Sequence, residues 1–343
     1  MRRKRVLLAA LLALAVAGVS IAAGTASASR NGGTLTGAGS TFVAPLVSLW
    51  SSVYHGSTIN YSPVGSGAGI GAISNRQVDF GASDAPLTKD QFSACHGCVQ
   101  IPWALSGTSV PYNVNGVPDG LHMTGQILAQ IFLGKVTKWN NPAIKALNPG
   151  VKLPGLKITP IYRSDASGTT FNFTEYLSKV SSAFKSQVGK GTQVNFPVGI
   201  SGKGSSGVAA QLNQTNGGIT YVDVAYSLKN GFKYFKVKNK AGTFTFPTIK
   251  SITAARKTVT RVPKSNEISI VDPPASKANA YPICTFTYVI VPLKSSKAAG
   301  LKKFIGWAVT KGQSASGVGK LLFVPIGKVV QTAAQKTLTK IHS

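Results

Sequence analysis

Acidic side chains are scarce in this 343-residue chain: nine Asp and Glu stand against 37 Lys and Arg, which gives a formal net charge of +28. Histidine is also rare, and no His, Cys, Asp and Glu cluster has metal-ligand spacing. A Gly-x-Ser-x-Gly nucleophile elbow is absent as well. We therefore expect no metal, no cofactor and no enzymatic activity. A protein this basic attracts small anions, an anionic envelope or nucleic acid.

Cysteine occurs three times, as Cys95, Cys98 and Cys284. The near pair can close a small disulfide loop, but either member can instead pair with Cys284, and the sequence leaves the connectivity open. One Cys-x-x-Cys without a second such pair is a weak metal signal.

Long hydrophobic runs are limited to one, from Val6 to Ala23, which follows four basic residues and precedes Ala26-Ser27-Ala28. This pattern predicts a secretory signal peptide cleaved after Ala28, with an uncleaved anchor as the alternative. Because no cysteine follows the run, we expect export to the periplasm or cell exterior without a lipid anchor. No transmembrane span is expected in the mature chain.

Strand and helix patterns alternate through the 315 residues after Ala28, which predicts an α/β fold of two lobes. Short strands are expected at 58–61, 78–82, 101–104, 109–114, 158–162 and 219–222, and a long one at 281–291. The run 318–322 is expected in a closing helix. The alternations 235–238 and 244–246 predict ordinary strands inside the basic region 229–264, although interleaved aromatics also suit single-strand nucleic-acid binding.

The stretch Arg163 to Thr170 joins a buried strand to a helix and is rich in hydroxyls. Such a turn directs backbone N–H groups, hydroxyls and one guanidinium at a common point, which favours an oxygen-rich anion. A simple helix cap is the alternative. Three more strand ends carry similar turns, around Thr41, Ser66 and Asp84, and a further hydroxyl- and glycine-rich stretch spans 198–207.

Known nucleotide motifs do not fit these turns. Ile70 stands where the last glycine of Gly-x-Gly-x-x-Gly would fall after Gly65 and Gly67, and Lys203 is followed by Gly204 rather than Ser or Thr. A smaller anion fits the glycine-rich turns better.

Asp84 is unusual for an anion site. An ionised carboxylate only accepts hydrogen bonds, so it favours an anion that still carries a proton, as phosphate does and sulfate does not. Asp84 capping its own turn is the alternative. Asp165 is expected to pair with Arg163, or else to act as an N-cap.

Four motifs, at 37–42, 65–66, 79–86 and 163–169, resemble the phosphate-binding protein of bacterial ABC-type phosphate importers, and the resemblance covers nearly all of the chain after residue 28. It implies a two-lobed periplasmic-binding-protein fold (type II), with lobe 1 at 29–111 plus 286–343 and lobe 2 at 112–285. Each lobe would be an open mixed sheet flanked by helices. It implies a monomer whose partners are inorganic phosphate and the permease subunits. The implied phosphate ligands are Thr41, Phe42 (through its backbone), Ser66, Asp84, Arg163, Ser167, Gly168 and Thr169, with Asp165 behind Arg163.

Three departures accompany this resemblance. Ala166 replaces a common glycine, Ser40 stands where alanine is usual, and the region 229–264 looks unlike the family, which leaves permease docking open. One alternative is a basic protein that associates with the cell envelope or with nucleic acid, although we expect no specific nucleic-acid partner. The other alternative is a phosphatase that uses the same anion pocket.

Overall fold

The computed structural model describes residues 33–343. The expected signal peptide at 1–28 lies outside these residues. Within the described part of the chain, no helix combines the length and hydropathy that crossing a bilayer requires.

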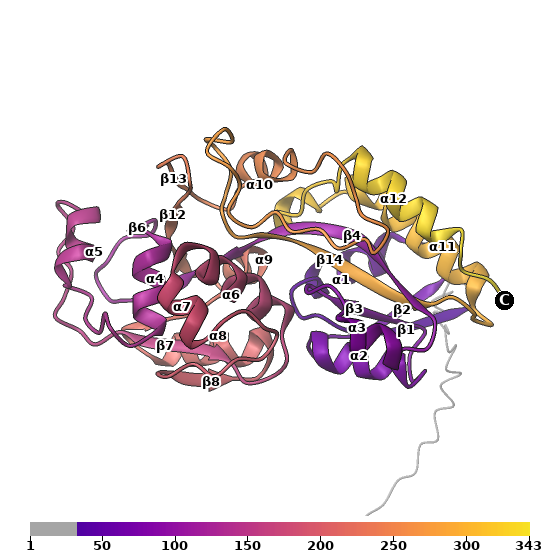
Figure 1. Ribbon diagram of the computed structural model, residues 1–343, viewed down its shortest axis with the longest axis horizontal. Helices are drawn as coiled ribbons and strands as arrows, with labels where there is room; N and C mark the ends of the chain where they lie inside the picture. The colour runs from indigo at the N-terminus through magenta and orange to yellow at the C-terminus, as the bar shows by residue number, and fades with distance from the viewer. Residues whose placement is uncertain (1–32) are drawn as a thin grey trace, which may run out of the picture.

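The first lobe is built on a six-stranded mixed sheet (Figure 1). Its order is β2-β1-β3-β14-β4-β10, with β1 parallel to β2 and β3 and β14 antiparallel to both of its neighbours. The strands are β1 (Thr34–Gly39), β2 (Thr58–Ser62), β3 (Phe80–Ser83), β4 (Cys98–Ser109), β10 (Val222–Asp223) and β14 (Cys284–Pro292).

Helices cover this sheet. They are α1 (Ala44–Val53), α2 (Ser66–Ser74), α3 (Lys89–Ala94), α11 (Ala298–Ala308) and α12 (Lys328–Leu338), with two 3-10 turns, η1 (Lys311–Ser314) and η2 (Gly319–Leu321). Helix α3 begins with a capping box, in which Thr88 and Gln91 exchange side-chain and backbone hydrogen bonds. Fully buried aromatics such as Trp50, Phe80 and Trp103 fill the core of this lobe.

The second lobe contains a five-stranded sheet in the order β8-β7-β9-β5-β11. Its strands are β5 (Pro111–Asn113), β7 (Thr159–Arg163), β8 (Ile200–Gly202), β9 (Gly218–Ile219) and β11 (Lys233–Tyr234). A three-stranded sheet adds β6 (His122–Met123), β12 (Lys236–Lys238) and β13 (Phe244–Thr245). The helices in this part of the chain are α4 (Gly125–Phe132), α5 (Pro142–Leu147), α6 (Gly168–Val180), α7 (Ser182–Gln187), α8 (Gly204–Gln214), α9 (Val224–Lys229) and α10 (Ile249–Arg256).

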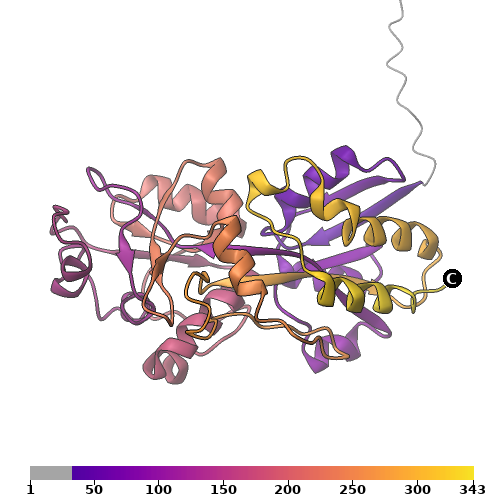
Figure 2. The ribbon, with the colours of Figure 1, turned by 90° about the horizontal axis from the view of Figure 1, so that it is seen from above.

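Two long antiparallel strands, β4 and β14, connect the two lobes (Figures 1 and 2). The two-lobed α/β fold expected from the sequence is therefore confirmed. The residue boundaries between the lobes stay a prediction. Two contacts join segments that this prediction assigns to different lobes. Strand β10 pairs with β4 in the first sheet, and Arg256 at the end of α10 donates to the carbonyl of Pro325.

Three local expectations were wrong. Residues 98–109 form one continuous strand where a strand at 101–104 and a separate one from 109 were expected, because β14 pairs with residues 98–107 and β10 with 108–109. The run 219–222 divides into β9 and β10, which join different sheets, because Ile219 pairs with β5 and β7 while Val222 pairs with β4. The segment 318–322 is a 3-10 turn that ends on a left-handed Leu322.

The cysteine connectivity and the basic region are also resolved. Cys95 is bonded to Cys98, and Cys284 is a buried free thiol whose pKa is raised by that burial. The strands predicted within 229–264 are confirmed as β12 and β13, in which Val237 is buried and Lys238 is exposed.

Candidate anion-binding site

The first lobe presents its predicted residues at one edge of its sheet. Thr41 and Phe42 lie in the turn between β1 and α1, Ser66 opens α2, and Asp84 directly follows β3. Because β1 and β3 are parallel neighbours, their carboxyl ends meet at that edge, where open α/β sheets bind ligands.

The second lobe contributes the end of β7 and the start of α6. Arg163 is the last residue of β7, and its side chain is buried. Ser167 is the N-cap of α6, and its hydroxyl accepts from the backbone N–H of Thr170. Gly168 and Thr169 form the first turn, so their backbone N–H groups belong to the positive end of a 13-residue helix.

Direct hydrogen bonds join the two lobes at this point. Arg163 Nη1 donates to Thr41 Oγ1 at 3.2 Å, and the N–H of Gly168 donates to Ser66 Oγ at 3.1 Å. The N–H of Gly67 donates to the carbonyl of Ala166 at 2.9 Å. The lobes are therefore in contact, and the turn at Gly168 lies against Asp84 so closely that an added Cβ would be 2.6 Å from the backbone nitrogen of Asp84.

Asp165 holds Arg163 in place. Its two carboxylate oxygens accept from Nε and Nη2 of Arg163, the first at 2.7 Å, and the N–H of Gly204 adds a third bond at 2.9 Å. Burial alone would raise the pKa of Asp165, but the bonds from Arg163 outweigh it and lower the pKa. The predicted pairing with Arg163 is confirmed, and the N-cap of α6 is Ser167 instead.

Asp84 is 2% exposed and lies between a hydroxyl and the Arg163 charge. Burial raises its pKa to about 7, while the hydrogen bond from Ser40 and the positive charge of Arg163 act in the opposite direction. Ser40 Oγ donates to Asp84 Oδ1 at 2.5 Å. These two neighbours therefore favour the ionised, purely accepting form of Asp84 near neutral pH.

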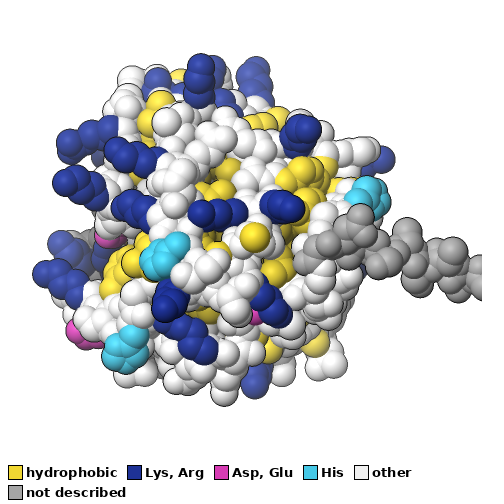
Figure 3. Space-filling model, turned by 90° about the vertical axis from the view of Figure 1, so that its right-hand side faces the viewer, with side chains coloured by type: hydrophobic (Ala, Val, Ile, Leu, Met, Phe, Trp, Pro, Cys, Tyr) yellow, Lys and Arg dark blue, Asp and Glu magenta, His cyan; other side chains and the backbone are white. Residues whose placement is uncertain are grey.

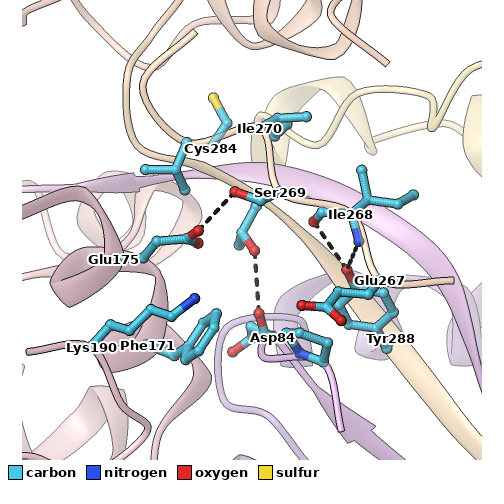
Figure 4. A pocket seen from close by; sticks show the side chains of 13 residues that line it. Asp84, Phe171, Glu175, Lys190, Glu267, Ile268, Ser269, Ile270, Cys284 and Tyr288 are labelled. Carbon is cyan, nitrogen blue, oxygen red and sulfur yellow. Dashed lines mark hydrogen bonds between the residues drawn. The ribbon is translucent and has the colours of Figure 1, made fainter. Parts of the chain in front are cut away.

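A small cavity of about 20 Å³ borders Asp84 (Figure 4). Its polar lining includes Glu175, Lys190 and Ser269, and Ser269 donates to Glu175 at 2.9 Å. This volume has room for about one water molecule. A tetrahedral anion therefore does not fit in this cavity.

Two buried polar atoms near the site lack a hydrogen-bond partner among residues 33–343. One is Thr169 Oγ1, and the other is Asp223 Oδ2. The second oxygen of Asp223 caps α9 by accepting from the N–H of Tyr226 at 2.8 Å. Burial raises the pKa of Asp223 well above its ordinary value, and the nearby Asp84 adds to the rise.

Sequence reasoning missed three residues around this site: Asp223, Ser205 and the contact of Ser40. Ser205 is buried at the start of α8, and its hydroxyl lies 2.9 Å from Thr41 Oγ1 on the other lobe. Its only sequence signal was the hydroxyl- and glycine-rich stretch at 198–207. In the sequence, Asp223 is a carboxylate that follows a predicted buried strand, and nothing more marks it as part of the site. The serine at position 40 stands out because alanine is usual there, but the sequence does not predict its hydrogen bond to Asp84.

Comparison with known proteins gives a consistent result. A model of the PBP superfamily domain matches residues 24–311. The phosphate-binding protein PstS of Xylella fastidiosa is 40% identical over 299 residues, covering 85% of this chain and 81% of that protein. The PstS of Haemophilus influenzae is 37% identical over 315 residues, covering 90% and 93%.

Solved structures show the same fold. A phosphate-binding protein from Stenotrophomonas maltophilia superposes with a TM-score of 0.66 at 19% identity, covering 88% of this chain and 93% of the other. The two lobes, the strand-end turns that meet between them and the sequence identity over most of the chain agree. The chain therefore belongs to the PBP superfamily and, within it, to the family of the phosphate-binding proteins PstS.

Proposed function

We propose that this protein binds inorganic phosphate outside the cytoplasmic membrane and delivers it to the permease subunits of an ABC phosphate importer. The observation that carries the proposal is the position of Asp84, a buried carboxylate directly beside the N-terminus of α6 and near the guanidinium of Arg163. A lone acceptor among so many donors suits an anion that offers both acceptor oxygens and a proton.

In the proposed ligand set, phosphate is bound by one positive charge, by backbone N–H groups at a helix N-terminus and by side-chain hydroxyls. Arg163 supplies the full positive charge, held by Asp165, and the start of α6 supplies N–H groups. The buried hydroxyl of Thr169, which has no hydrogen-bond partner among residues 33–343, supports its place in this set. The complete set is Thr41, Phe42, Ser66, Asp84, Arg163, Ser167, Gly168 and Thr169.

Selectivity follows from the proton. Phosphate and arsenate keep a proton near neutral pH and can donate it to Asp84. Fully ionised sulfate has no proton to donate, so the acceptor positions of Asp84 that Ser40 does not fill stay unpaired beside like charge. A buried unpaired acceptor costs about 1–3 kcal/mol or more. The site should therefore reject sulfate while tolerating arsenate.

The protein works as a monomeric carrier in the periplasm or at the cell surface, without a lipid anchor and without chemistry on its ligand. Its moving parts are the lobes expected at 29–111 plus 286–343 and at 112–285. Contacts such as Arg163 to Thr41 support a closed state, because each bond has one partner in each lobe.

Calorimetry with phosphate, arsenate and sulfate tests the proposal. We expect tight binding of phosphate and arsenate and little binding of sulfate, and equal sulfate affinity would overturn it. The phosphatase alternative is tested in parallel with a generic phosphate ester. Release of phosphate that Arg163→Ala abolishes would establish catalysis.

A further inference from the structure

The positive charge of this protein is unevenly distributed along the chain. Residues 224–343 contain twenty Lys and Arg side chains and two acidic ones, Glu267 and Asp272, whereas residues 33–223 contain twelve and seven. Phosphate binding uses Arg163 and does not account for this excess. Residues 224–343 therefore carry most of the net charge of the described chain.

Part of this charge lies where α10 and the segment that follows it pack against the chain from Pro325 to α12. The end of α10 contacts the segment just before α12 through the bond from Arg256 Nη1 to the carbonyl of Pro325 at 2.8 Å. Further along, Asn266 Nδ2 donates to Thr337 Oγ1 of α12 at 2.8 Å. Figure 1 shows α10 and α12 on the same side of the connecting strands β4 and β14. We call this surface the basic face and define it by Lys250, Arg256, Lys257, Arg261, Lys264, Lys328, Lys336 and Lys340.

These cations are available to a partner. Seven of the eight side chains are exposed, and Arg256 is partly buried. The ion pairs among residues 33–343 involve Arg163, Lys179, Lys240 and Lys297, none of which belongs to the basic face. Figure 3, which views the end of the molecule next to this face, shows many Lys and Arg side chains and few acidic ones. The local potential is therefore strongly positive.

The composition of the basic face indicates what it binds. Six of its eight cations are lysines, and the exposed aliphatic side chains Ile249 and Val329 stand next to Lys250 and Lys328, at 40% and 45% exposure. Among the described residues, the large hydrophobics that are exposed include no aromatic ring for stacking on nucleobases. Lysines with a few aliphatic side chains suit a bilayer surface, where each cation near anionic headgroups contributes about 1 kcal/mol.

We propose that the basic face binds the surface of an anionic lipid bilayer. None of its eight residues belongs to the proposed phosphate ligands, so a membrane-attached molecule can still bind phosphate. Attachment through this face would retain the protein at the membrane without a lipid anchor or a transmembrane helix.

Vesicle binding with charge-matched variants tests the inference, using the chain from Ser29 onward. The wild type is mixed with vesicles of phosphatidylglycerol and phosphatidylcholine, or of phosphatidylcholine alone, at several salt concentrations. The triple variant Lys257→Glu, Lys328→Glu, Lys336→Glu reverses three charges on the face. The control Lys138→Glu, Lys145→Glu, Lys152→Glu makes the same change in net charge at exposed positions outside the face.

We expect salt-sensitive binding to the anionic vesicles only, weakened by roughly tenfold or more in the face variant and much less in the control. Equal weakening in both variants would show that net charge alone acts, and would overturn the proposal. Tighter binding to single-stranded DNA than to the vesicles at the same salt would overturn it in favour of nucleic acid. Both variants should bind phosphate as tightly as the wild type in calorimetry. A loss of vesicle binding can then be told apart from a loss of phosphate binding.

Discussion

The hydroxyl of Ser40 donates to Asp84 Oδ1 at 2.5 Å and accepts from the N–H of Phe42 at 3.0 Å. These are the two bonds that a protonated phosphate oxygen would make in the proposed site, because it too would donate to Asp84 and accept from Phe42. The family resemblance implies alanine at this position. This chain therefore carries an internal hydroxyl that stabilises the ionised form of Asp84.

Ser40→Ala should shift the pH dependence of phosphate binding upward. Removing a donor to a carboxylate raises the pKa of Asp84 above about 7, so less of the accepting form is present at neutral pH. Hydrogen bonds to charged groups contribute about 1.5–3 kcal/mol, which sets the scale of the loss at neutral pH. Calorimetry across pH measures it against wild type, so that the titration of phosphate itself cancels. An unchanged midpoint would show that Ser40 does not act on Asp84.

Asp84→Asn should loosen the discrimination between phosphate and sulfate. The amide can donate to a sulfate oxygen, so the penalty on the wrong anion is relieved. We expect the preference for phosphate to fall by about tenfold or more, the equivalent of at least ~1.4 kcal/mol. Competition titrations measure the ratio, and Asp90→Asn, on the exposed face of α3, is the matched control. A wild-type ratio in the Asp84 variant would argue against its role in selectivity.

The same substitution should change how stability depends on pH. Burial raises the pKa of Asp84 to about 7, so the folded protein keeps a proton that the unfolded chain releases near pH 4. Stability without phosphate therefore falls as pH rises from about 4 to about 7, and Asn removes this part of the loss. Urea unfolding of both proteins should show an advantage for the variant that is absent near pH 4 and grows toward pH 7. A constant difference across this range would contradict the shifted pKa.

Gly168→Ala should prevent closure of the lobes. The added Cβ would lie 2.6 Å from the Cβ and backbone nitrogen of Asp84, closer than carbon and nitrogen atoms can approach. Phosphate affinity should fall by about a hundredfold or more, since the N-terminus of α6 and Asp84 can no longer meet. The control is Gly71→Ala in α2, where a Cβ meets nothing within 4 Å and Ala stabilises the helix by up to about 1 kcal/mol. Similar affinities in the two variants would mean that the closed contact is not required.

Ser205→Ala should weaken binding slightly, through faster release. Its hydroxyl bridges to Thr41 of the other lobe, and one such bond contributes about 0.5–1.5 kcal/mol, a few-fold in rate. Stopped-flow measurement of phosphate release gives this rate directly. Ser206→Ala, at the exposed neighbouring position, should leave it unchanged. Identical release from both variants would remove Ser205 from the closing contacts.

Local patterns predicted the parts of the site that depend on local geometry. The strand-end turns and the pairing of Arg163 with Asp165 follow from residues close together in sequence, and both are present. Contacts between the lobes were not predictable in this way. The bond from Ser205 to Thr41 depends on how two separate sheets are oriented, and single-sequence periodicity contains no information on that.

Tertiary packing determines two further features that local sequence patterns did not predict: the burial of Asp223 and the sheet that each half of 219–222 joins. Asp223 looks like any loop carboxylate in the sequence, yet it lies in β10, pairs with β4 and is fully buried. The division of 219–222 between two sheets has the same origin, because each half is held by a different partner strand. Short apolar runs predict a strand but not which sheet it joins.

The position of β14 within the first sheet has a consequence for how the chain is made. This strand lies between β3 and β4, yet it comes about 180 residues after β4 in the sequence. Synthesis proceeds at roughly 5–20 residues per second, so β14 is made on the order of 10–40 s after β4. The first sheet lacks its central strand during this time. Half of the molecule therefore stays incomplete until almost the whole chain has left the ribosome, which would favour the export that the expected signal peptide implies.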